Sequence, residues 1–311
     1  MRKLKRKNKK NSKGEKILIS IISVLIVILI GVIALNINKG RTSEVSVNQN
    51  QKEDNNEIKS NINEEKSNEK ETDSVIYTSY ENDINADNAR DIENMLNKWS
   101  YLREDGKKIA YLTFDDGPSV ETTPKILETL RKNNIKATFF VLGSNVEKSD
   151  TQKELLKEMV KEGHAIGNHG YCHDYSILYP GRVADTTVFI NDMEKSENVM
   201  KSVLGDSFST KVIRFPGGHM SWKTGDLDKV LEQDGYTYID WNVLNGDAES
   251  NGRTVEQLIN RLKETVTDLA GNDDVLVILM HDTDAKVTTA ESLQQSIDYL
   301  KSLGYEFRTL K

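Results

Sequence analysis

The chain has 311 residues, of which 37% are hydrophobic and 29% charged, with a formal net charge of −7 and a single cysteine. One cysteine excludes a disulfide scaffold and a cysteine-rich zinc site, and the length allows one catalytic domain of about 200–250 residues plus appendages. Residues 1–16 hold nine Lys or Arg and one Glu, whereas the remainder holds 33 basic and 48 acidic residues. This acidic body argues against nucleic acid as a partner.

Residues 17–35 form an uncharged run in which only Ser20 and Ser23 are polar. A helix of this length spans the roughly 30 Å hydrocarbon core of a bilayer. The basic residues 1–16 are predicted to stay in the cytoplasm, which places the rest of the chain outside. A cleavable signal peptide is the alternative, but its apolar region would have only about 7–15 residues and end at a small-x-small site. We therefore expect an uncleaved signal anchor that crosses the cell membrane once.

Residues 36–73 are rich in Asn, Glu, Lys and Ser and contain no aromatic residue. Such a stretch cannot bury enough apolar surface to fold, so we predict a disordered extracellular linker. A tether of this kind suits a target beyond the bilayer, such as a cell wall. Residues 74–105 are a transitional segment with helical spacing over residues 88–99, and the sequence assigns them no role.

Residues 106–311 are predicted to form the catalytic domain, because strands and helices alternate throughout. The expected strands are residues 109–114, 137–142, 165–166, 212–215, 236–240, 275–280 and 305–310. The expected helices are residues 122–132, 153–161, 185–203, 225–233, 254–269 and 289–302. This alternation is typical of a parallel α/β sheet with crossover helices. Residues 275–280 are apolar at every position, as in a strand buried on both faces.

Polar side chains follow the predicted strands, where parallel α/β folds gather their active sites. Asp115 and Asp116 come after the first strand, and two adjacent carboxylates repel each other unless a cation or proton compensates. His169 and His173 come after the third strand. On a helical turn their spacing would place both imidazoles on one side, as a metal site requires.

Three further strands end in Arg214, Asp240 and His281. Each residue alone is equally compatible with an ordinary surface or core-edge position. Five strand ends that converge favour a barrel over an open doubly wound sheet. Two histidines and an aspartate with an open position form a catalytic zinc site, and the remaining carboxylate, histidine and arginine supply a base, an acid and an orienting cation. The pattern indicates metal-assisted hydrolysis.

These segments resemble the five ordered motifs of the polysaccharide deacetylases, the NodB-homology domains of carbohydrate esterase family 4. The matching residues are Thr113-Phe114-Asp115-Asp116-Gly117-Pro118, His169-x3-His173, Arg214-Phe215-Pro216-Gly217-Gly218, Asp240-Trp241 and Leu279-Met280-His281-Asp282. The resemblance runs from about residue 108 to 311. It implies a distorted (β/α) barrel that removes N- or O-acetyl groups from sugars.

The resemblance also implies a role for each side chain. The metal, Zn²⁺ or another divalent ion such as Co²⁺, would be held by Asp116, His169 and His173. Asp115 would be the general base, oriented by Arg214, and His281 the general acid, supported by Asp240. The N–H of Gly217 would help to bind the oxyanion. A water activated by the metal would lose its proton to Asp115 and attack the acetamide, and His281 would protonate the leaving amine.

Two positions depart from the family pattern. Gly170 stands where a Ser or Thr usually follows the first histidine, so the histidine loop loses a bracing hydroxyl. Gly217 stands where a Tyr or another large residue is frequent, which alters the pocket wall. Neither departure removes a metal ligand or an acid–base group.

The expected partner is peptidoglycan and the expected substrate its N-acetylglucosamine, because the catalytic domain is predicted to lie outside a membrane on a disordered tether, within reach of the wall. We expect the protein to be monomeric. N-acetylmuramic acid, chitooligosaccharide, poly-N-acetylglucosamine and acetylated xylan remain alternatives. A non-catalytic wall-binding module would be expected to lose a ligand or the base, and all are present. A transmembrane sensor would need a signalling domain, for which residues 1–16 are too short.

Overall fold

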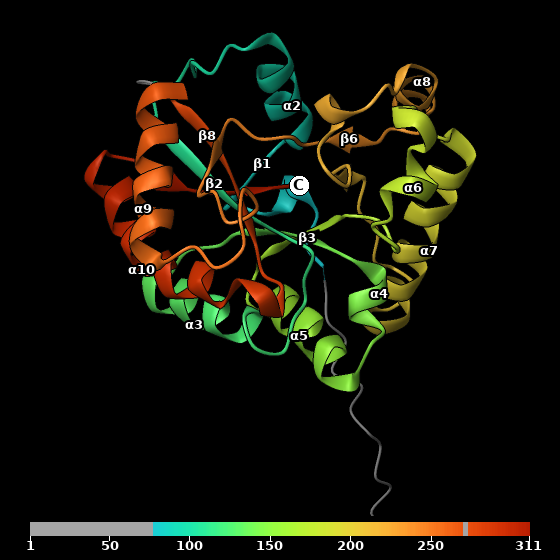
Figure 1. Cartoon of the computed structure of the whole chain (residues 1–311), viewed down its shortest axis with the longest axis horizontal. Coiled ribbons are helices and arrows are strands. Elements are labelled where there is room, and N and C mark those ends of the chain that lie inside the picture. The colour runs from blue at the N-terminus through green and yellow to red at the C-terminus, as the bar shows by residue number, and fades with distance from the viewer. Residues whose placement is uncertain (1–76, 270–272) are drawn as a thin grey trace, which may run out of the picture. The chain divides into compact units, whose positions relative to one another are not determined.

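A curled parallel sheet forms the centre of the structure, a computed structural model that describes residues 77–269 and 273–311 (Figure 1). The predicted cytoplasmic tail, membrane anchor and linker, residues 1–16, 17–35 and 36–73, lie outside the described residues. Within residues 77–269 and 273–311, no helix has both the length and the apolar character needed to cross a membrane.

The strands of this sheet are arranged in the order β6 (Thr237–Tyr238), β5 (Val212–Ile213), β4 (Ala165–Asn168), β3 (Thr138–Val141), β2 (Ile109–Asp115), β8 (Val275–His281) and β7 (Val243–Leu244). A further strand, β9 (Glu306–Phe307), pairs with the start of β2. All pairings are parallel. Across the described residues no pairing joins β6 to β7, so the sheet is a curled half-barrel. The predicted α/β class and the parallel direction of the strands are confirmed, and in the part of the chain that the structure describes the sheet does not close into a complete barrel.

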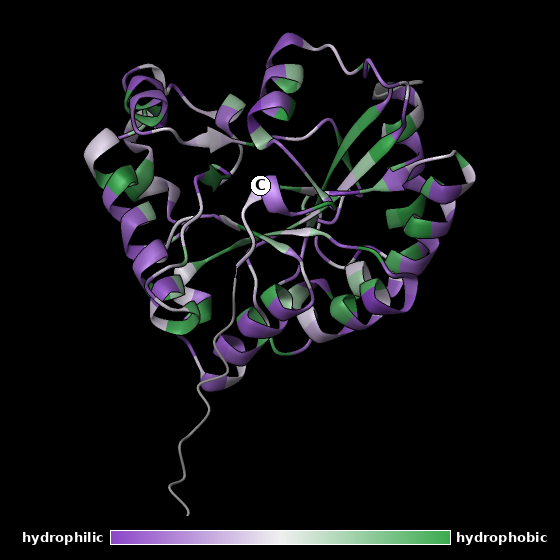
Figure 2. Ribbon diagram, turned by 180° about the vertical axis from the view of Figure 1, so that it is seen from behind, coloured by the Kyte–Doolittle hydropathy of each residue, from purple (hydrophilic) through white to green (hydrophobic). Residues whose placement is uncertain are grey.

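The two central strands place polar groups at the edge of the core. Every residue of β2 is buried, as are the first six of β8. Figure 2 shows the central strands as mainly hydrophobic and the helices around them as hydrophilic on their outer sides. Side chains buried on both faces of a parallel sheet are normally apolar. Asp115 therefore stands out as a carboxylate in the core, and the β2–β8 register sets it opposite His281.

Helices surround the sheet, and most begin at a residue that can cap them. They are α3 (Thr123–Asn133), α5 (Asp150–Lys161), α7 (Thr186–Leu204), α8 (Gly225–Gln233), α9 (Val255–Glu264) and α10 (Val287–Ser302). The short helices are α4 (Gly143–Val146), α6 (Tyr175–Leu178) and the 3₁₀ turns η2 (Tyr80–Asn82), η3 (Pro180–Arg182), η4 (His219–Ser221) and η6 (Asp284–Lys286). Ser149, Asp185 and Thr254 accept N–H bonds at the starts of α5, α7 and α9. The helix predicted over residues 254–269 is α9 followed by the π-helical turn η5 (Thr265–Leu269).

Residues 77–105 are part of the same compact unit. Strand β1 (Ala86–Asp87) pairs with β10 (Thr309–Leu310), and α2 (Ala89–Lys98) follows it. Helix α2 buries Ile92 and Leu96 in a core cluster that includes Ile109 of β2 and Ile239 after β6. Figure 1 shows α2 beside β6, with which it is in contact. The segment that the sequence left without a role is therefore held next to one end of the sheet.

Candidate active site

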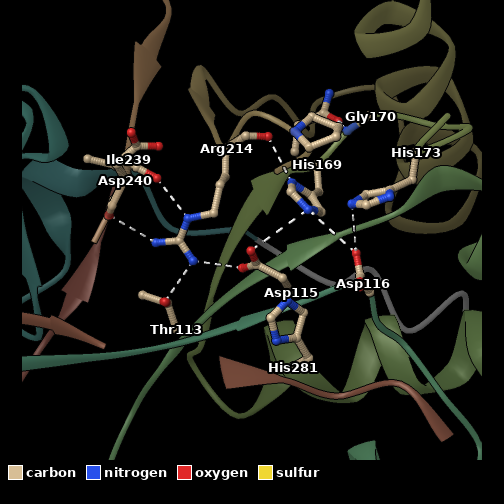
Figure 3. A network of polar contacts seen from close by, with 12 residues as sticks. Thr113, Asp115, Asp116, His169, Gly170, His173, Arg214, Ile239, Asp240 and His281 are labelled. Carbon is tan, nitrogen blue, oxygen red and sulfur yellow. Dashed lines mark hydrogen bonds and ion pairs between the residues drawn. The ribbon is translucent and has the colours of Figure 1, made fainter. Parts of the chain in front are cut away.

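The side chains that follow the strands converge on one site. Asp115 ends β2 and Asp116 follows it, His169 follows β4, Arg214 follows β5, and His281 ends β8. Figure 3 shows these side chains pointing toward one another from their separate strands. The carboxyl ends of parallel strands lie at one edge of a sheet, which is why residues far apart in the sequence meet here.

Asp116, His169 and His173 form a cluster suited to a metal ion. Oδ1 of Asp116 lies 3.5 Å from Nε2 of His169 and 3.5 Å from Nε2 of His173. The three ligand atoms all lie within 4.8 Å of one another. Oδ1 of Asp116 is buried and has no hydrogen-bond partner among the described residues. A buried carboxylate oxygen is normally satisfied, so two imidazole nitrogens beside it fit a divalent cation such as Zn²⁺.

His169 presents the correct nitrogen to this cluster. Its Nδ1 lies 2.8 Å from the carbonyl oxygen of Arg214, so the ring donates from Nδ1 and leaves the Nε2 lone pair facing Asp116. Burial lowers the pKa of His169, against the opposing effect of the two aspartates, and so favours the neutral ring. A neutral imidazole is the form that binds metals.

The two histidines are brought together by a loop. We expected a helical turn, but residues 169–174 are irregular, with positive φ angles of 81° at Gly170 and 51° at His173. The loop is tied to its neighbours by backbone N–H groups, because Gly170 donates to Oδ1 of Asn168 at 2.9 Å. The spacing of four residues indicated correctly that the two imidazoles lie together, but an irregular loop and not a helical turn brings them there.

Asp192 of α7 supplies the bracing that the sequence appeared to lack. Its carboxylate accepts the N–H of Tyr171 at 2.7 Å and that of Cys172 at 3.1 Å. A Cβ at Gly170 would lie 2.5 Å from Oδ2 of Asp192. Glycine therefore permits the close approach of a carboxylate to the histidine loop. No local sequence signal pointed to Asp192, which lies in the middle of a long helix.

Asp115 and Arg214 form a buried ion pair, with 2% and 0% of their surface exposed. Nη1 of Arg214 donates to Oδ1 of Asp115 at 2.7 Å and to Oγ1 of Thr113 at 2.7 Å. Its Nε donates to the carbonyl of Ile239 at 2.7 Å, and its Nη2 to that of Asp240 at 3.3 Å. These bonds fix the planar guanidinium. Oδ2 of Asp115 remains directed toward the metal cluster, 3.8 Å from Nε2 of His169.

The carboxylate that supports His281 is Asp247. Oδ1 of Asp247 lies 2.8 Å from Nδ1 of His281, and its Oδ2 accepts the His281 N–H at 2.8 Å. Burial alone would lower the pKa of His281, but the hydrogen bond and charge of Asp247 outweigh it and raise the pKa to about 9. This interaction favours the protonated ring of His281, the form that a general acid needs.

The resemblance implied Asp240 for this position, and the structure corrects it. The Asp240 carboxylate accepts the N–H groups of His219 at 2.9 Å and Met220 at 3.3 Å, so it holds the turn after β5. Asp247 was missed because it follows β7, a strand of two residues that leaves no pattern in the sequence. The weak signal was an Asn-Gly-Asp turn, and Asn245 does accept the Asp247 N–H at 3.0 Å.

Gly217 lies beneath aromatic side chains of other elements. Its φ is 80°, and a Cβ there would lie 3.1 Å from Oη of Tyr175 and 3.2 Å from the Trp222 ring. Tyr175, at the start of α6, also lies beside His173, with ring centroids 5.2 Å apart. Tyr175 and Trp222 thus occupy the space that a side chain at position 217 would take. The oxyanion role of the Gly217 N–H remains a prediction.

A further carboxyl that we did not single out lies under the site. Asp282 is fully buried, and its Oδ2 accepts the hydroxyl of Thr123 at 2.6 Å. A Cβ at Gly117 would lie only 2.1 Å from this carboxyl, so the turn after Asp116 rests directly on it. Burial, together with the negative charges of Asp115 and Asp116, raises the pKa of Asp282 to about 7.

Comparison with known proteins identifies the family of the chain. The model of the polysaccharide deacetylase family matches residues 103–239. A putative polysaccharide deacetylase of Bacillus subtilis is 33% identical over 207 residues, which are 66% of this chain and 68% of that protein. A peptidoglycan-N-acetylglucosamine deacetylase of Bacillus cereus is 32% identical over 214 residues, 68% of this chain and 73% of that protein.

A solved structure supports the same assignment. A CE4 esterase of Streptococcus mutans is similar at a TM-score of 0.66 and 38% identity, over 73% of this chain and 92% of that one. The chain therefore belongs to the polysaccharide deacetylase family and is a hydrolase of carbon–nitrogen bonds other than peptide bonds.

Proposed function

We propose that this protein removes the N-acetyl group of N-acetylglucosamine in peptidoglycan, and that residues 17–35 anchor it to the outer face of the cell membrane. The observation that carries the reaction is the placement of Asp116, His169 and His173 beside the Asp115–Arg214 pair and opposite His281. These groups together supply a metal site, a base and an acid at one strand edge.

The metal-binding residues would be Asp116, His169 and His173. A Zn²⁺ ion held by these residues would supply Lewis acidity for the hydrolysis. The fit rests on the orphaned Oδ1 of Asp116 and on the neutral, correctly oriented ring of His169. Asp192 and the Arg214 carbonyl keep the histidine loop in place.

Asp115 and His281 would divide the proton transfers. The ion pair with Arg214 occupies Oδ1 of Asp115, which leaves Oδ2 to accept a proton from the attacking water. The C–N bond of the acetamide then breaks, and His281 gives its proton to the leaving nitrogen. Asp247 holds His281 in its protonated form and in position until that step. The products are acetate and a free amino sugar.

Two observations support peptidoglycan as the substrate. The Bacillus cereus relative is named for peptidoglycan N-acetylglucosamine, and an anchored domain on a linker would reach the wall. N-acetylmuramic acid, chitooligosaccharide, poly-N-acetylglucosamine and acetylated xylan are the competing substrates. They share the acetyl group, so the chemistry alone does not separate them.

The test is acetate release by the full-length protein in detergent from purified peptidoglycan, chitooligosaccharide and acetylated xylan. Each assay is run with added zinc, with a chelator, and with Asp115→Asn; Asp226→Asn, an exposed carboxylate of α8, is the matched control. We expect zinc-dependent release from peptidoglycan that Asp115→Asn abolishes and Asp226→Asn retains. Release only from another polymer overturns the proposed substrate. A folded, zinc-binding protein that releases acetate from none of them overturns the proposed activity.

A further inference from the structure

A hollow of about 270 Å³ lies beside the candidate active site. It is lined by residues from the end of α2 and from the turns after β5 and β6, among them Asn97, Trp99, Gly217, Met220 and Trp241. Helix α2 is held next to β6 by core contacts, so the residues from both sides are in fixed positions (Figure 1). The volume is just below the roughly 300–1,000 Å³ of typical ligand pockets, which is suited to one ring rather than a whole polymer.

Two lining residues of the hollow, Gly217 and Trp241, are in contact with residues of the candidate active site. Gly217 packs against Tyr175, which in turn lies beside the metal-site residue His173. On the other side, the Trp241 ring lies 5.7 Å from the Arg214 guanidinium, which binds Asp115. A molecule in the hollow would therefore border on one that reacts at the site.

Neither the backbone conformation nor the packing of the core explains a tryptophan at position 99. It follows the last residue of α2 with φ 51° and ψ 40°, a left-handed conformation that suits Gly or Asn and costs a bulky residue roughly 1–2 kcal/mol. The residue is 75% exposed, so little burial of apolar surface offsets this cost. Met220, on the opposite side of the hollow, is 74% exposed. A strained, exposed indole at a pocket rim is typical of a binding surface.

The chemistry of the hollow matches a sugar ring. A pyranose presents C–H groups on its faces and hydroxyl and amide groups around its edge. An exposed indole accommodates the apolar face. Asn97 and Ser221 belong to the same lining; the Asn97 amide also donates to the Tyr238 hydroxyl at 3.0 Å and the Ser221 hydroxyl to the Gly217 carbonyl at 2.7 Å, so their oxygen atoms are the groups left to accept from sugar hydroxyls. The lining includes Asp240, whose carboxylate is already bound to two backbone N–H groups, so the hollow is not built for a cation.

We propose that this hollow is a subsite for the sugar ring next to the one that is deacetylated, with Trp99 as its stacking platform. The inference rests on the proposed function and deepens it, because it makes the substrate a polymer of at least two rings. It also gives residues 77–105 a role, since α2 carries Trp99 to the site. Trp99 then acts in substrate binding and specificity, not in the chemical step.

The experiment compares Trp99→Asn with the wild-type full-length protein on N-acetylglucosamine oligomers of one to five rings. Asn suits the left-handed conformation, so the variant should be at least as stable as the wild type. We expect KM for the longer oligomers to rise about two- to tenfold, the range of one aromatic stacking contact, with kcat unchanged and no change for the single ring. Leu102→Asn is the matched control, because Leu102 is 70% exposed in the same segment but lines a different hollow.

Binding of the same oligomers, measured by calorimetry, decides the subsite independently of turnover. Weaker binding of long oligomers by Trp99→Asn, but not by Leu102→Asn, supports the subsite even if the reacting sugar has been misassigned. An unchanged KM and affinity, or an equal loss for one ring and for five, overturns it. Wild-type protein that binds no oligomer also overturns it, whereas absence of acetate release with normal binding refutes only the proposed reaction.

Discussion

The substitution Asp247→Asn should move the alkaline limit of activity. The pair with Asp247 raises the pKa of His281 from 6.5 to about 9, a difference equivalent to about 3 kcal/mol. Asn keeps the shape and an acceptor oxygen but removes the charge, so burial should return the pKa to about the ordinary 6.5, against the remaining charges of Asp115 and Asp116. At pH 7.5 the protonated fraction of His281 would fall from about 97% to about 10%, so kcat should drop about tenfold. The loss should shrink as the pH falls toward 6.

The measurement is the pH profile of kcat for wild type, Asp247→Asn and Asp240→Asn at saturating zinc. A bound cation lowers the pKa of His281 in all three proteins, so the displacement between profiles is the readout. Because the folded-state pKa is raised, the pair stabilises the fold fully below pH 6.5 and loses this effect as pH rises through 9. The variant should therefore be most destabilised at pH 6 and close to wild type above pH 9. An alkaline limb of Asp247→Asn that overlays the wild type, or an equal shift in Asp240→Asn, would refute the assignment.

Three other substitutions test the surroundings of the site. Gly170→Ser would restore the hydroxyl common in the family, but the φ of 81° and the contact with Asp192 should lower stability by about 1–3 kcal/mol, seen in thermal unfolding. His169→Gln removes one metal-binding group, so calorimetry should show zinc affinity lower by about 100-fold or more, and zinc should no longer raise Tm. Arg214→Lys keeps the charge but cannot make all four guanidinium bonds. We expect kcat to fall at least tenfold with little change in KM, and an unfolding free energy lower by about 2–4 kcal/mol. A variant that retains wild-type values in its assay would contradict the corresponding contact.

Long apolar strands and amphipathic helices could be predicted from the sequence. Helix α8 has the predicted bounds, and β2 and β8 differ from the prediction by one residue at one end. The two-residue strands β5 and β6 lie within the predicted strands 212–215 and 236–240, but β7, also of two residues, was not predicted. A pattern with period two needs more positions to be visible. Strand β7 forms one edge of the sheet, opposite the edge formed by β6. The curled half-barrel fits the distorted barrel that the resemblance implied, and its open edge lies at the strand that the sequence did not reveal.

The same distinction separates the site residues. Asp115, His169, Arg214 and His281 follow strands that the sequence reveals, so topology alone brings them together. The residues that hold them come from elsewhere. Asp192 is in the middle of a helix, and Asp247 follows β7. A supporting residue can lie on any element that tertiary packing brings within hydrogen-bonding distance of the site, so no spacing in the sequence identifies it.

The pair Asp115-Asp116 shows how the fold gives adjacent, identical residues different tasks. Along a strand, consecutive side chains point to opposite faces, so both carboxylates could not face one site if β2 continued. The strand ends at Asp115, and Asp116 adopts a left-handed φ of 71°. Its N–H donates to the Phe140 carbonyl at 3.2 Å and its carbonyl accepts from Asn145 at 2.7 Å, which together hold this conformation.

The left-handed turn at Asp116 therefore determines which of the two carboxylates faces the histidines and which binds Arg214. It brings the second carboxylate to the two histidines, where Oδ1 has no protein donor, while the first remains bound to Arg214. A backbone conformation of this kind costs about 1–3 kcal/mol and persists only where the surroundings fix it. A cation that bound these three side chains would bind only the folded chain. Its binding energy would then offset both the strained turn and the buried, unpartnered oxygen.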